Sequence, residues 1–461
     1  MQNIRSISVT KLFGRYNYTL PASNQFLDDV NILYGENGAG KTTLLSLVFH
    51  LLSPAENAGH RNRISETPFV QLEVALKDGT RISAKKDPQL LVGPVEFRIT
   101  GIHQRPVTWR FTPGVPTLGS IKAEDLPNNI DLERLPNEMR QQVSRALEQK
   151  RFFEELRKLE ITVFMLTSDR ILLGDSVRDT PRPDPRGDGS RARARLSEIV
   201  LEHRIAAVTD ALNTASAWVR SKFLERTYGP NESSTNLYLD VAKKIAKSTY
   251  RTKTGLSAAQ QAKTIAALEQ SIADIQRRTA EFQRFGLGVL AVSPELLPTV
   301  QGAQGNRLQL ISTILEPHLA SVKARYDGLQ PLYNLINTFV NAINKFFREK
   351  KIEYSVRGGF RIVVETDQSA TQDITPGQLS SGEQQLLLLF CHVLTTRDNP
   401  SIFIIDEPEL SLNIVWQRML VASMLEVAKG SMLQLILASH SMEILAKHRD
   451  RVVSMQETKV A

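Results

Sequence analysis

The sequence predicts an α/β fold whose two halves come from opposite ends of the 461-residue chain, with a helical segment between them. A glycine-rich loop at residues 35–42 joins an apolar, strand-like run to an apolar, helix-like run. Far along the chain, the apolar run Ser401–Ile405 ends in two carboxylates, Asp406 and Glu407, as a buried parallel strand would. Between these segments, apolar residues recur at spacings of three and four over residues 265–282, which predicts an amphipathic helix.

The glycine-rich loop is predicted to bind phosphate groups. It fits the pattern G-x-x-x-x-G-K-[ST] and lies between a strand and a helix N-terminus, the context that this pattern requires. Glycines let backbone N–H groups turn toward phosphate oxygens where a Cβ atom would collide. Lys41 is expected to reach the β- and γ-phosphates, and the Thr42 hydroxyl to ligate Mg²⁺. The loop therefore predicts that the chain binds a nucleoside triphosphate through Gly35, Glu36, Asn37, Gly38, Ala39, Gly40, Lys41, Thr42 and Thr43.

The acids after the C-terminal strand are predicted to act on the bound nucleotide. Open α/β sheets bind ligands at the carboxyl ends of their strands. Asp406 is expected to hold Mg²⁺ through water, together with Thr42, and Glu407 to polarise the attacking water. A further apolar run, Leu433–Ala438, leads to His440, which lies just past a strand end and could contact the γ-phosphate. We therefore expect Glu407 to be catalytic. Position alone leaves His440 equally open to a role without catalysis, and only the resemblance of its segment to a family motif, described next, implies that it is catalytic.

Together with the loop, three segments resemble the motifs of ABC-type ATPases. LSSGEQQ at residues 379–385 is similar to their signature, IFIIDEPE at 402–409 to their Walker B motif with its catalytic glutamate, and ASHS at 438–441 to their switch-histidine segment. The resemblance implies ATP and Mg²⁺ as cofactors, and a homodimer or higher homo-oligomer that encloses two ATP molecules. In such an assembly, the signature contacts the nucleotide of the opposite copy through Ser380, Ser381, Gly382 and Glu383.

The long interval between the motifs is typical of one branch of this family. From Lys41 to Leu379 it is several times the interval in a transporter nucleotide-binding domain. The chain therefore resembles the RecF, SMC and OLD (overcoming-lysogenisation-defect) branch. The resemblance implies an ABC-type P-loop ATPase head, with a mixed sheet and an antiparallel β lobe, split by a helical, short coiled-coil insertion. The expected parts are residues 1–170 (first half of the head with the β lobe), 171–351 (arginine-rich loop and insertion) and 352–461 (second half of the head).

Local patterns predict the elements around these motifs. Short strand-like runs separated by turn signals at residues 68–112 predict the antiparallel lobe. Residues 352–367 are expected to form two strands that lead back to the head. Within the insertion, a returning helix is expected from Asn306, bent or broken by Pro317 and Pro331.

The sequence does not decide the roles of two groups of residues in the predicted head. Phe13, Arg15 and Tyr16 would either flank the adenine base or pack the small sheet. No glutamine follows the strand at residues 161–166, where ABC-type heads couple the nucleotide to their helical domain. Asp169 or Arg170 is the candidate that remains for this role.

The excess of positive charge favours acidic partners. A net charge of +8 and a pI near 9.4 make nucleic acid a candidate partner. Residues 177–195 are rich in proline, glycine and mixed charge, and predict a mobile loop. Its arginines Arg191, Arg193 and Arg195 would either bind phosphates or be solvated as part of a linker.

Composition also predicts the compartment. The longest apolar run, around Leu386–Leu394, is far shorter than the roughly 18 residues that a membrane span needs. The single cysteine, Cys391, excludes a disulfide within the chain and a zinc hook of the Rad50 kind. The N-terminus begins in a strand pattern rather than a signal peptide. These observations predict a cytoplasmic protein without a membrane partner.

The two ends of the chain further resemble the stand-alone AAA-family ATPases of bacterial anti-phage systems of the Septu and PARIS types. That resemblance implies a low-turnover ATPase, converting ATP and water to ADP and phosphate, that dimerises on ATP. It would serve as sensor and scaffold for a separate effector, a nuclease or toxin. The alternatives are a RecF-like ATPase of DNA repair or recombination that acts directly on DNA, and a stress-signalling ATPase without nucleic-acid contact.

Overall fold

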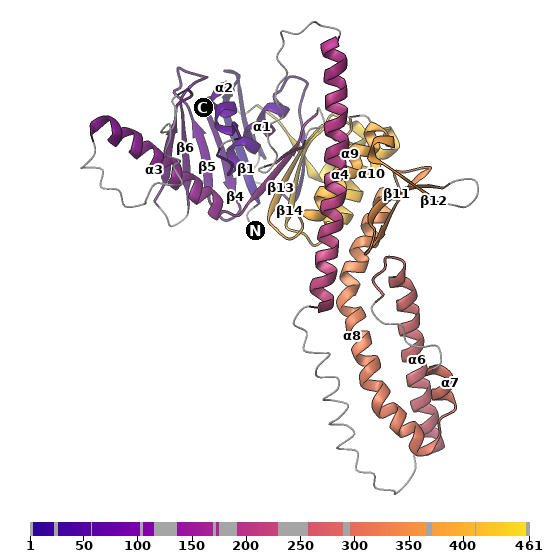
Figure 1. The fold of residues 1–461 in the computed structure, drawn as a ribbon. Coiled ribbons are helices and arrows are strands. Elements are labelled where there is room, and N and C mark those ends of the chain that lie inside the picture. The colour runs from indigo at the N-terminus through magenta and orange to yellow at the C-terminus, as the bar shows by residue number, and fades with distance from the viewer. Residues whose placement is uncertain are drawn as a thin grey trace. The chain divides into compact units, whose positions relative to one another are not determined.

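The computed structural model describes residues 3–457 except residues 23–25, 57, 102–104, 115–135, 169–171, 175–190, 229–256, 289–295, 366–370 and 411. The chain divides into two compact units (Figure 1). The first comprises Met1–Ala206 and Val393–Ala461, and the second comprises Ala207–His392. The division into residues 1–170, 171–351 and 352–461 stays a prediction, and Asp169 and Arg170 lie outside the described residues.

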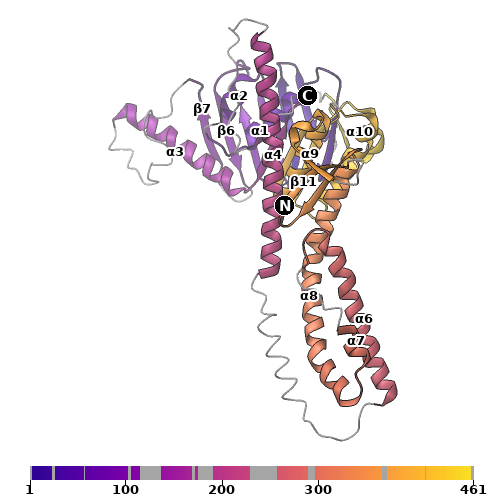
Figure 2. The same ribbon diagram turned by 45° about the vertical axis from the view of Figure 1, so that its right-hand side comes forward.

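The first unit contains a six-stranded sheet that joins strands from both ends of the chain, and the colour in Figures 1 and 2 runs from indigo at the N-terminus to yellow at the C-terminus. Its order is β15-β3-β14-β13-β8-β9, and every neighbouring pair is parallel except β8 with β9. Strands β13 and β14 are buried along their whole length, as predicted from the apolar residues of each run, although β14 also buries the polar Gln434. The strands are β3 (Val30–Tyr34), β8 (Thr162–Leu166), β9 (Leu172–Gly174), β13 (Ser401–Asp406), β14 (Leu433–Ala438) and β15 (Val452–Ser454).

A second, antiparallel sheet forms the predicted β lobe. Its order is β2-β1-β4-β5-β6-β7. Buried and exposed side chains alternate along β4, β5 and β6, because one face packs on the core and the other faces solvent. The strands are β1 (Ile4–Leu12), β2 (Tyr16–Leu20), β4 (Gln71–Leu76), β5 (Arg81–Lys85), β6 (Val95–Thr100) and β7 (Val107–Phe111).

Helices of the first unit pack on these two sheets. Helix α1 (Lys41–Leu52) contacts β5 of the antiparallel sheet and β8, β13 and β14 of the parallel sheet. One hydrophobic core therefore includes residues of both sheets. The remaining helices are α2 (His60–Glu66), α3 (Asn137–Lys158), which packs on β6 and β7, α10 (Ile414–Ala428), α11 (Met442–Lys447) and the 3-10 turn η4 (Arg449–Arg451).

The second unit is mainly helical and carries a small antiparallel sheet. The sheet has the order β10-β11-β12 and includes the strand pair predicted at residues 352–367. Helix α4 (Arg191–Tyr228) begins in the first unit and ends in the second. The other elements are α6 (Ala258–Gln283), α7 (Leu296–Gln301), α8 (Gly305–Asn344), β10 (Lys350–Ser355), β11 (Gly359–Glu365), β12 (Thr371–Ile374), the 3-10 turn η3 (Pro376–Gln378) and α9 (Ser381–Thr395).

The insertion is helical as predicted, but its helices are arranged differently. Near the start of both helices, the Gly305 amide of α8 donates to Gln261 of α6 at 3.3 Å. Near their far ends, Phe282 of α6 stacks on Tyr333 of α8 with ring centroids 4.7 Å apart. Residues farther along α6 contact residues farther along α8, so the two helices run parallel. The expectation that the second helix returns antiparallel to the first was therefore wrong. A parallel pair needs a connection that runs back along it, and α7 lies on that connection.

Two further expectations about the insertion need correction. Pro317 and Pro331, which were expected to bend or break the helix, lie inside α8, so neither breaks it. Arg191, Arg193 and Arg195 lie in the first turns of α4 rather than in a loop. Arginine and alanine alternate there, and both are strong helix formers. A coiled coil in the strict sense stays a prediction.

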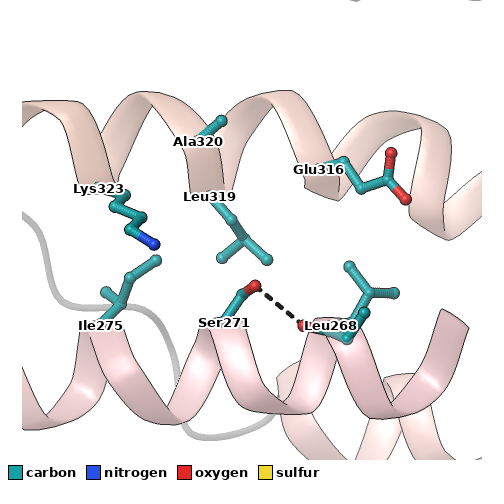
Figure 3. A pocket seen from close by; sticks show the side chains of 8 residues that line it. Leu268, Ser271, Ile275, Glu316, Leu319, Ala320 and Lys323 are labelled. Atoms are coloured by element: carbon teal, nitrogen blue, oxygen red, sulfur yellow. Dashed lines mark hydrogen bonds between the residues drawn. The ribbon is translucent and has the colours of Figure 1, made fainter. Parts of the chain in front are cut away.

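The α6 and α8 pair leaves a cavity of about 280 Å³ between its helices (Figure 3). Leu268 and Ile275 of α6 and Leu319 of α8 line it, with Glu316 and Lys323 of α8 beside them. The Ser271 hydroxyl donates to the Ala267 carbonyl at 2.9 Å, so its polar group is satisfied within its own helix. None of the described helices is long and apolar enough to cross a membrane.

Gln434 ties the two sheets of the first unit together. The side chain lies on β14 and is fully buried. Its Oε1 accepts from the Ile4 amide of β1 at 2.7 Å, and its Nε2 donates to the Ile4 carbonyl at 2.9 Å. The same Nε2 donates to the carbonyl of Asp28, just before β3, at 2.9 Å.

Replacing Gln434 with alanine is expected to destabilise the first unit. The change leaves the N–H and C=O of Ile4 without their side-chain partner, and each unpaired buried polar group costs about 1–3 kcal/mol. Gln434→Ala should therefore lower the free energy of unfolding by roughly 2–5 kcal/mol in denaturant titrations. Gln89→Ala, at an exposed position of the same unit, should change it by less than about 0.5 kcal/mol. Equal stability of the two variants would contradict this account.

Candidate functional site

Three predicted motifs meet at the carboxyl edge of the parallel sheet. The pairing register aligns Leu33 of β3 with Ala438 of β14, and Ala438 with Asp406 of β13. Each strand ends within one residue of this line. The glycine-rich loop, the His440 segment and the Glu407 segment therefore start side by side, although they are far apart in the sequence.

The loop between β3 and α1 has the backbone that its glycines predict. Gly38 and Gly40 have φ of 83° and 84°, in the left-handed region that side chains rarely adopt. A Cβ atom on Gly40 would also lie 3.0 Å from Leu12 Cδ2 and 3.1 Å from Phe13 Cε2. Only glycine therefore fits at this position, directly before Lys41.

Lys41 lies inside the loop. Its side chain is buried, and Nζ donates to the carbonyls of Gly35 at 2.8 Å and Glu36 at 3.1 Å. Burial lowers the pKa of Lys41, and the nearby carboxylates of Glu407 and Asp406 oppose that shift. The ammonium group is thus held between the loop and the acids of the sheet edge, where phosphate groups would bind.

Asp406 fits the predicted cation site. Its side chain is 1% exposed, and neither carboxylate oxygen has a hydrogen-bond partner of regular geometry among the described residues. Burial raises its pKa, and the nearby Thr42 hydroxyl opposes this shift. A buried carboxylate without partners costs free energy unless a cation balances it. Hydroxyl and carboxylate oxygens are ligands that Mg²⁺ prefers, so Thr42 and Asp406 suit this ion.

Glu407 has a strained backbone. Its φ is 49°, in the left-handed region, and its amide donates to the Ala438 carbonyl at 2.9 Å. Such a conformation costs a non-glycine residue of order 1–3 kcal/mol and is common at functional sites. The turn directs the chain away from β13 just after Asp406 and leaves the Glu407 side chain half-buried at the sheet edge.

The His440 segment is anchored by an acid that sequence reasoning missed. Oε1 of Glu409 accepts from the amide of His440 at 2.7 Å, the amide of Ser441 at 3.0 Å and the hydroxyl of Ser439 at 2.8 Å. The only signal in the sequence is a second glutamate two residues after Glu407. That spacing does not reveal a partner on another loop.

The signature residues lie in the second unit, at the start of α9. Glu383 and Ser380 cap this helix: Oε2 of Glu383 accepts from the Ser380 amide at 2.7 Å, and the Ser380 hydroxyl accepts from the Glu383 amide at 3.3 Å. Burial alone raises the pKa of Glu383, but an ion pair with Lys350 at 2.9 Å and the Ser380 bonds outweigh it and lower the pKa. Contact of Ser380, Ser381, Gly382 and Glu383 with a nucleotide in trans stays a prediction.

The structure separates the candidates for contact with the base. Tyr16 stacks on Tyr18 with ring centroids 5.8 Å apart, and it packs against the core. Of its two possible roles, packing of the sheet is therefore the one that the structure supports. The Arg15 guanidinium lies 5.2 Å from the Tyr16 ring. Phe13 is 45% exposed, and its ring lies beside Gly40 of the loop. Phe13 is therefore more exposed than Tyr16, and contact of either residue with a base stays a prediction.

Comparison with solved structures finds SMC head domains at low similarity. The Smc head of Pyrococcus furiosus with an extended coiled coil, bound to the C-terminal domain of ScpA, is 14% identical with a TM-score of 0.34, and the match covers 99% of this chain and 94% of that chain. The Smc head of Pyrococcus yayanosii with a coiled coil and joint is 14% identical with a TM-score of 0.34, over 99% of this chain and 96% of that chain. These scores are too low to equate individual residues.

Comparison with curated proteins and families is more direct. The dipeptide transport ATP-binding protein DppD of Haemophilus influenzae is 22% identical over 145 residues, which are 32% of this chain and 42% of that protein. The chain thus spans less than half the length of this relative. A family model described as "AAA domain, putative AbiEii toxin, Type IV TA system" matches residues 30–446, a range that includes the glycine-rich loop, the acids of β13 and His440. The chain therefore belongs to this family of AAA domains, which supports an ATP-binding P-loop ATPase.

Proposed function

We propose that the chain is an ATP-driven switch that controls a separate effector, a nuclease or toxin, in anti-phage defence. Two copies close on ATP, hydrolysis reopens them, and the helical insertion passes the change to the effector. The observation that carries the proposal is the meeting of Lys41, Asp406 and Glu407 at one sheet edge. These are the groups needed to bind the phosphates, hold a metal ion and orient a water molecule.

In the proposed reaction, water attacks the γ-phosphorus atom and the bond to the bridging oxygen of ADP breaks. Loop amides and Lys41 hold the β- and γ-phosphates, and Mg²⁺, held by Thr42 and Asp406, would neutralise charge on their oxygens. Glu407 accepts a hydrogen bond from the attacking water and orients it. His440 contacts the γ-phosphate. The half-buried position of Glu407 beside the buried Lys41 and Asp406 supports these roles.

Exposed apolar residues beside the site support closure on a second copy. Four large apolar side chains are more than a third exposed at the starts of α10 and α11 and just before α10. The two helix starts are joined by a bond from the Ser441 hydroxyl to Gln417 at 2.8 Å. Exposed apolar clusters of this kind mark interaction surfaces. The four residues are Leu410, Ile414, Val415 and Met442.

The role in defence is supported by the family description. The family description names a putative toxin of a type IV toxin–antitoxin system. Among the described residues, no group of three or more His, Cys, Asp or Glu side chains could hold a metal ion as a nuclease centre would. The net charge of +8 instead supports the alternative, a RecF-like ATPase that acts directly on DNA.

Glu407→Gln is expected to bind ATP but not turn it over. The phosphate and metal contacts survive, while the group that orients the water is weakened, so kcat should fall by about 100-fold or more. ATP should then hold the variant as a closed dimer in sedimentation experiments. Lys41→Ala should lose the thermal stabilisation that ATP confers, whereas the exposed Lys77→Ala should keep it. Hydrolysis by Glu407→Gln at the wild-type rate would rule out the assigned role.

Mixing two inactive variants tests the shared site. Ser381→Arg should bind ATP as a monomer but prevent closure, because a large cation replaces a small hydroxyl near the opposed phosphate. A heterodimer of Ser381→Arg with Lys41→Ala contains one site built from two intact halves. ATPase activity should recover in part on mixing. If heterodimers form and no activity returns, the site is not shared between copies.

The effector and DNA alternatives differ in their salt dependence. If Arg191, Arg193 and Arg195 bind DNA, affinity should fall steeply with salt, and replacing all three should reduce the slope by up to about three phosphate contacts. Under the leading proposal, replacement leaves DNA binding weak and unchanged, and an effector protein co-purifies in a manner that depends on Lys41 and Glu407. Robust nuclease activity of the purified chain alone would contradict the proposal that a separate effector protein carries the destructive activity.

A further inference from the structure

Glu409 joins two loops that leave neighbouring strands. It follows β13 by three residues, and its side chain accepts hydrogen bonds from the segment that follows β14. A single oxygen, Oε1, accepts from Ser439 Oγ, His440 N and Ser441 N at distances of 2.7–3.0 Å. Bonds from N–H groups to an ionised carboxylate are about twice as strong as bonds between neutral groups. The backbone of His440 is therefore fixed by a residue of the Glu407 loop.

Gln417 of α10 adds a second link between the same segments. The Ser441 hydroxyl donates to Gln417 Oε1 at 2.8 Å, and Gln417 Nε2 donates to the Leu412 carbonyl at 2.9 Å. The Ser441 hydroxyl in turn accepts from the Ile444 amide and caps α11. The segment around His440 is thus bound on one side by Glu409 and on the other by Gln417.

A role in stabilising the fold alone would not require the Glu409 carboxylate to bind the segment around His440. Capping of α11 is already supplied by Ser441, so Glu409 is not needed to start that helix. The second oxygen of Glu409, Oε2, is buried and has no hydrogen-bond partner among the described residues. Burying a carboxylate oxygen without a hydrogen bond costs free energy, so such a residue is a poor choice if it serves only to join two loops. Its benefit lies in where it holds His440 relative to Glu407.

We propose that Glu409 is a positioning residue that fixes His440 beside Glu407 by tying the loop after β13 to the loop after β14. The role for His440 rests on the proposed function, whereas the tie itself follows from the hydrogen bonds. With both loops joined, His440 and Glu407 move as one body rather than independently. Loss of the tie should reduce turnover without loss of nucleotide binding, because the glycine-rich loop and Lys41 are untouched.

Hydrogen exchange tests the tie directly. In Glu409→Ala, the amides of His440 and Ser441 should exchange about tenfold faster or more, because they lose their acceptor. Glu409→Gln should stay near wild type, since its amide oxygen can still accept. Glu443→Ala removes an exposed acid of α11 that pairs with Arg418, and it serves as the matched control. If Glu409→Ala does not fold, Glu409→Asp replaces it, because its carboxylate is one methylene short of the donors. Unchanged exchange in the folded variant would overturn the proposal.

A double-mutant cycle tests the link to His440. Glu409→Ala should lower kcat by about tenfold and change KM for ATP by less than about twofold. In a His440→Ala background, the same change should lower kcat by less than about twofold, because the residue it positions is gone. An equal loss in both backgrounds would overturn the positioning role. If the wild-type chain hydrolyses no ATP, the proposed function fails, and hydrogen exchange still decides whether Glu409 holds the segment.

Discussion

Parallel pairing of β3, β14 and β13 determines where three distant parts of the sequence end. In a parallel sheet, neighbouring strands point their carboxyl ends to the same edge, and the register here aligns Leu33, Ala438 and Asp406. A shift of one residue in this register would turn each side chain to the opposite face. Both faces of β13 and β14 are buried, so such a shift would place each side chain against the wrong neighbours and disrupt the packing of the core. The geometry of the site therefore depends on the packing of the sheet.

The same edge concentrates features that do not favour folding. Lys41 is buried, and Glu407 occupies the left-handed region. Among the described residues, neither carboxylate oxygen of Asp406 has a hydrogen-bond partner of regular geometry. Each costs free energy in the absence of a ligand. Their location together at the ends of stable strands is what a binding site requires, because ligand binding can offset costs that the isolated fold bears. The core that both sheets share supplies the stability that this arrangement needs.

The sequence predicted those parts of the structure that follow from local pattern. The loop before Lys41, the strand before Asp406 and the β lobe each have a motif or a periodicity that specifies them. Periodicity shows which face of a helix is buried but not the direction of its partner, so the parallel pairing of α6 and α8 was missed. The tie made by Glu409 joins residues about thirty positions apart through one side chain, and no local pattern encodes it. Phe13 could be separated from Tyr16 only by their exposure in the folded chain.

The buried carboxylate of Asp406 allows the central claim to be tested by a binding measurement. Calorimetric titration with a slowly hydrolysed ATP analogue, with and without Mg²⁺, compares wild type with Asp406→Asn. The account predicts that Mg²⁺ strengthens binding to wild type by about tenfold or more and that Asp406→Asn loses this gain. It also predicts that both proteins bind the analogue similarly without Mg²⁺, because the loop and Lys41 are intact. An Asp406→Asn variant that keeps the full Mg²⁺ effect, or a wild-type chain that binds no analogue, would contradict the assignment of this sheet edge as the nucleotide site.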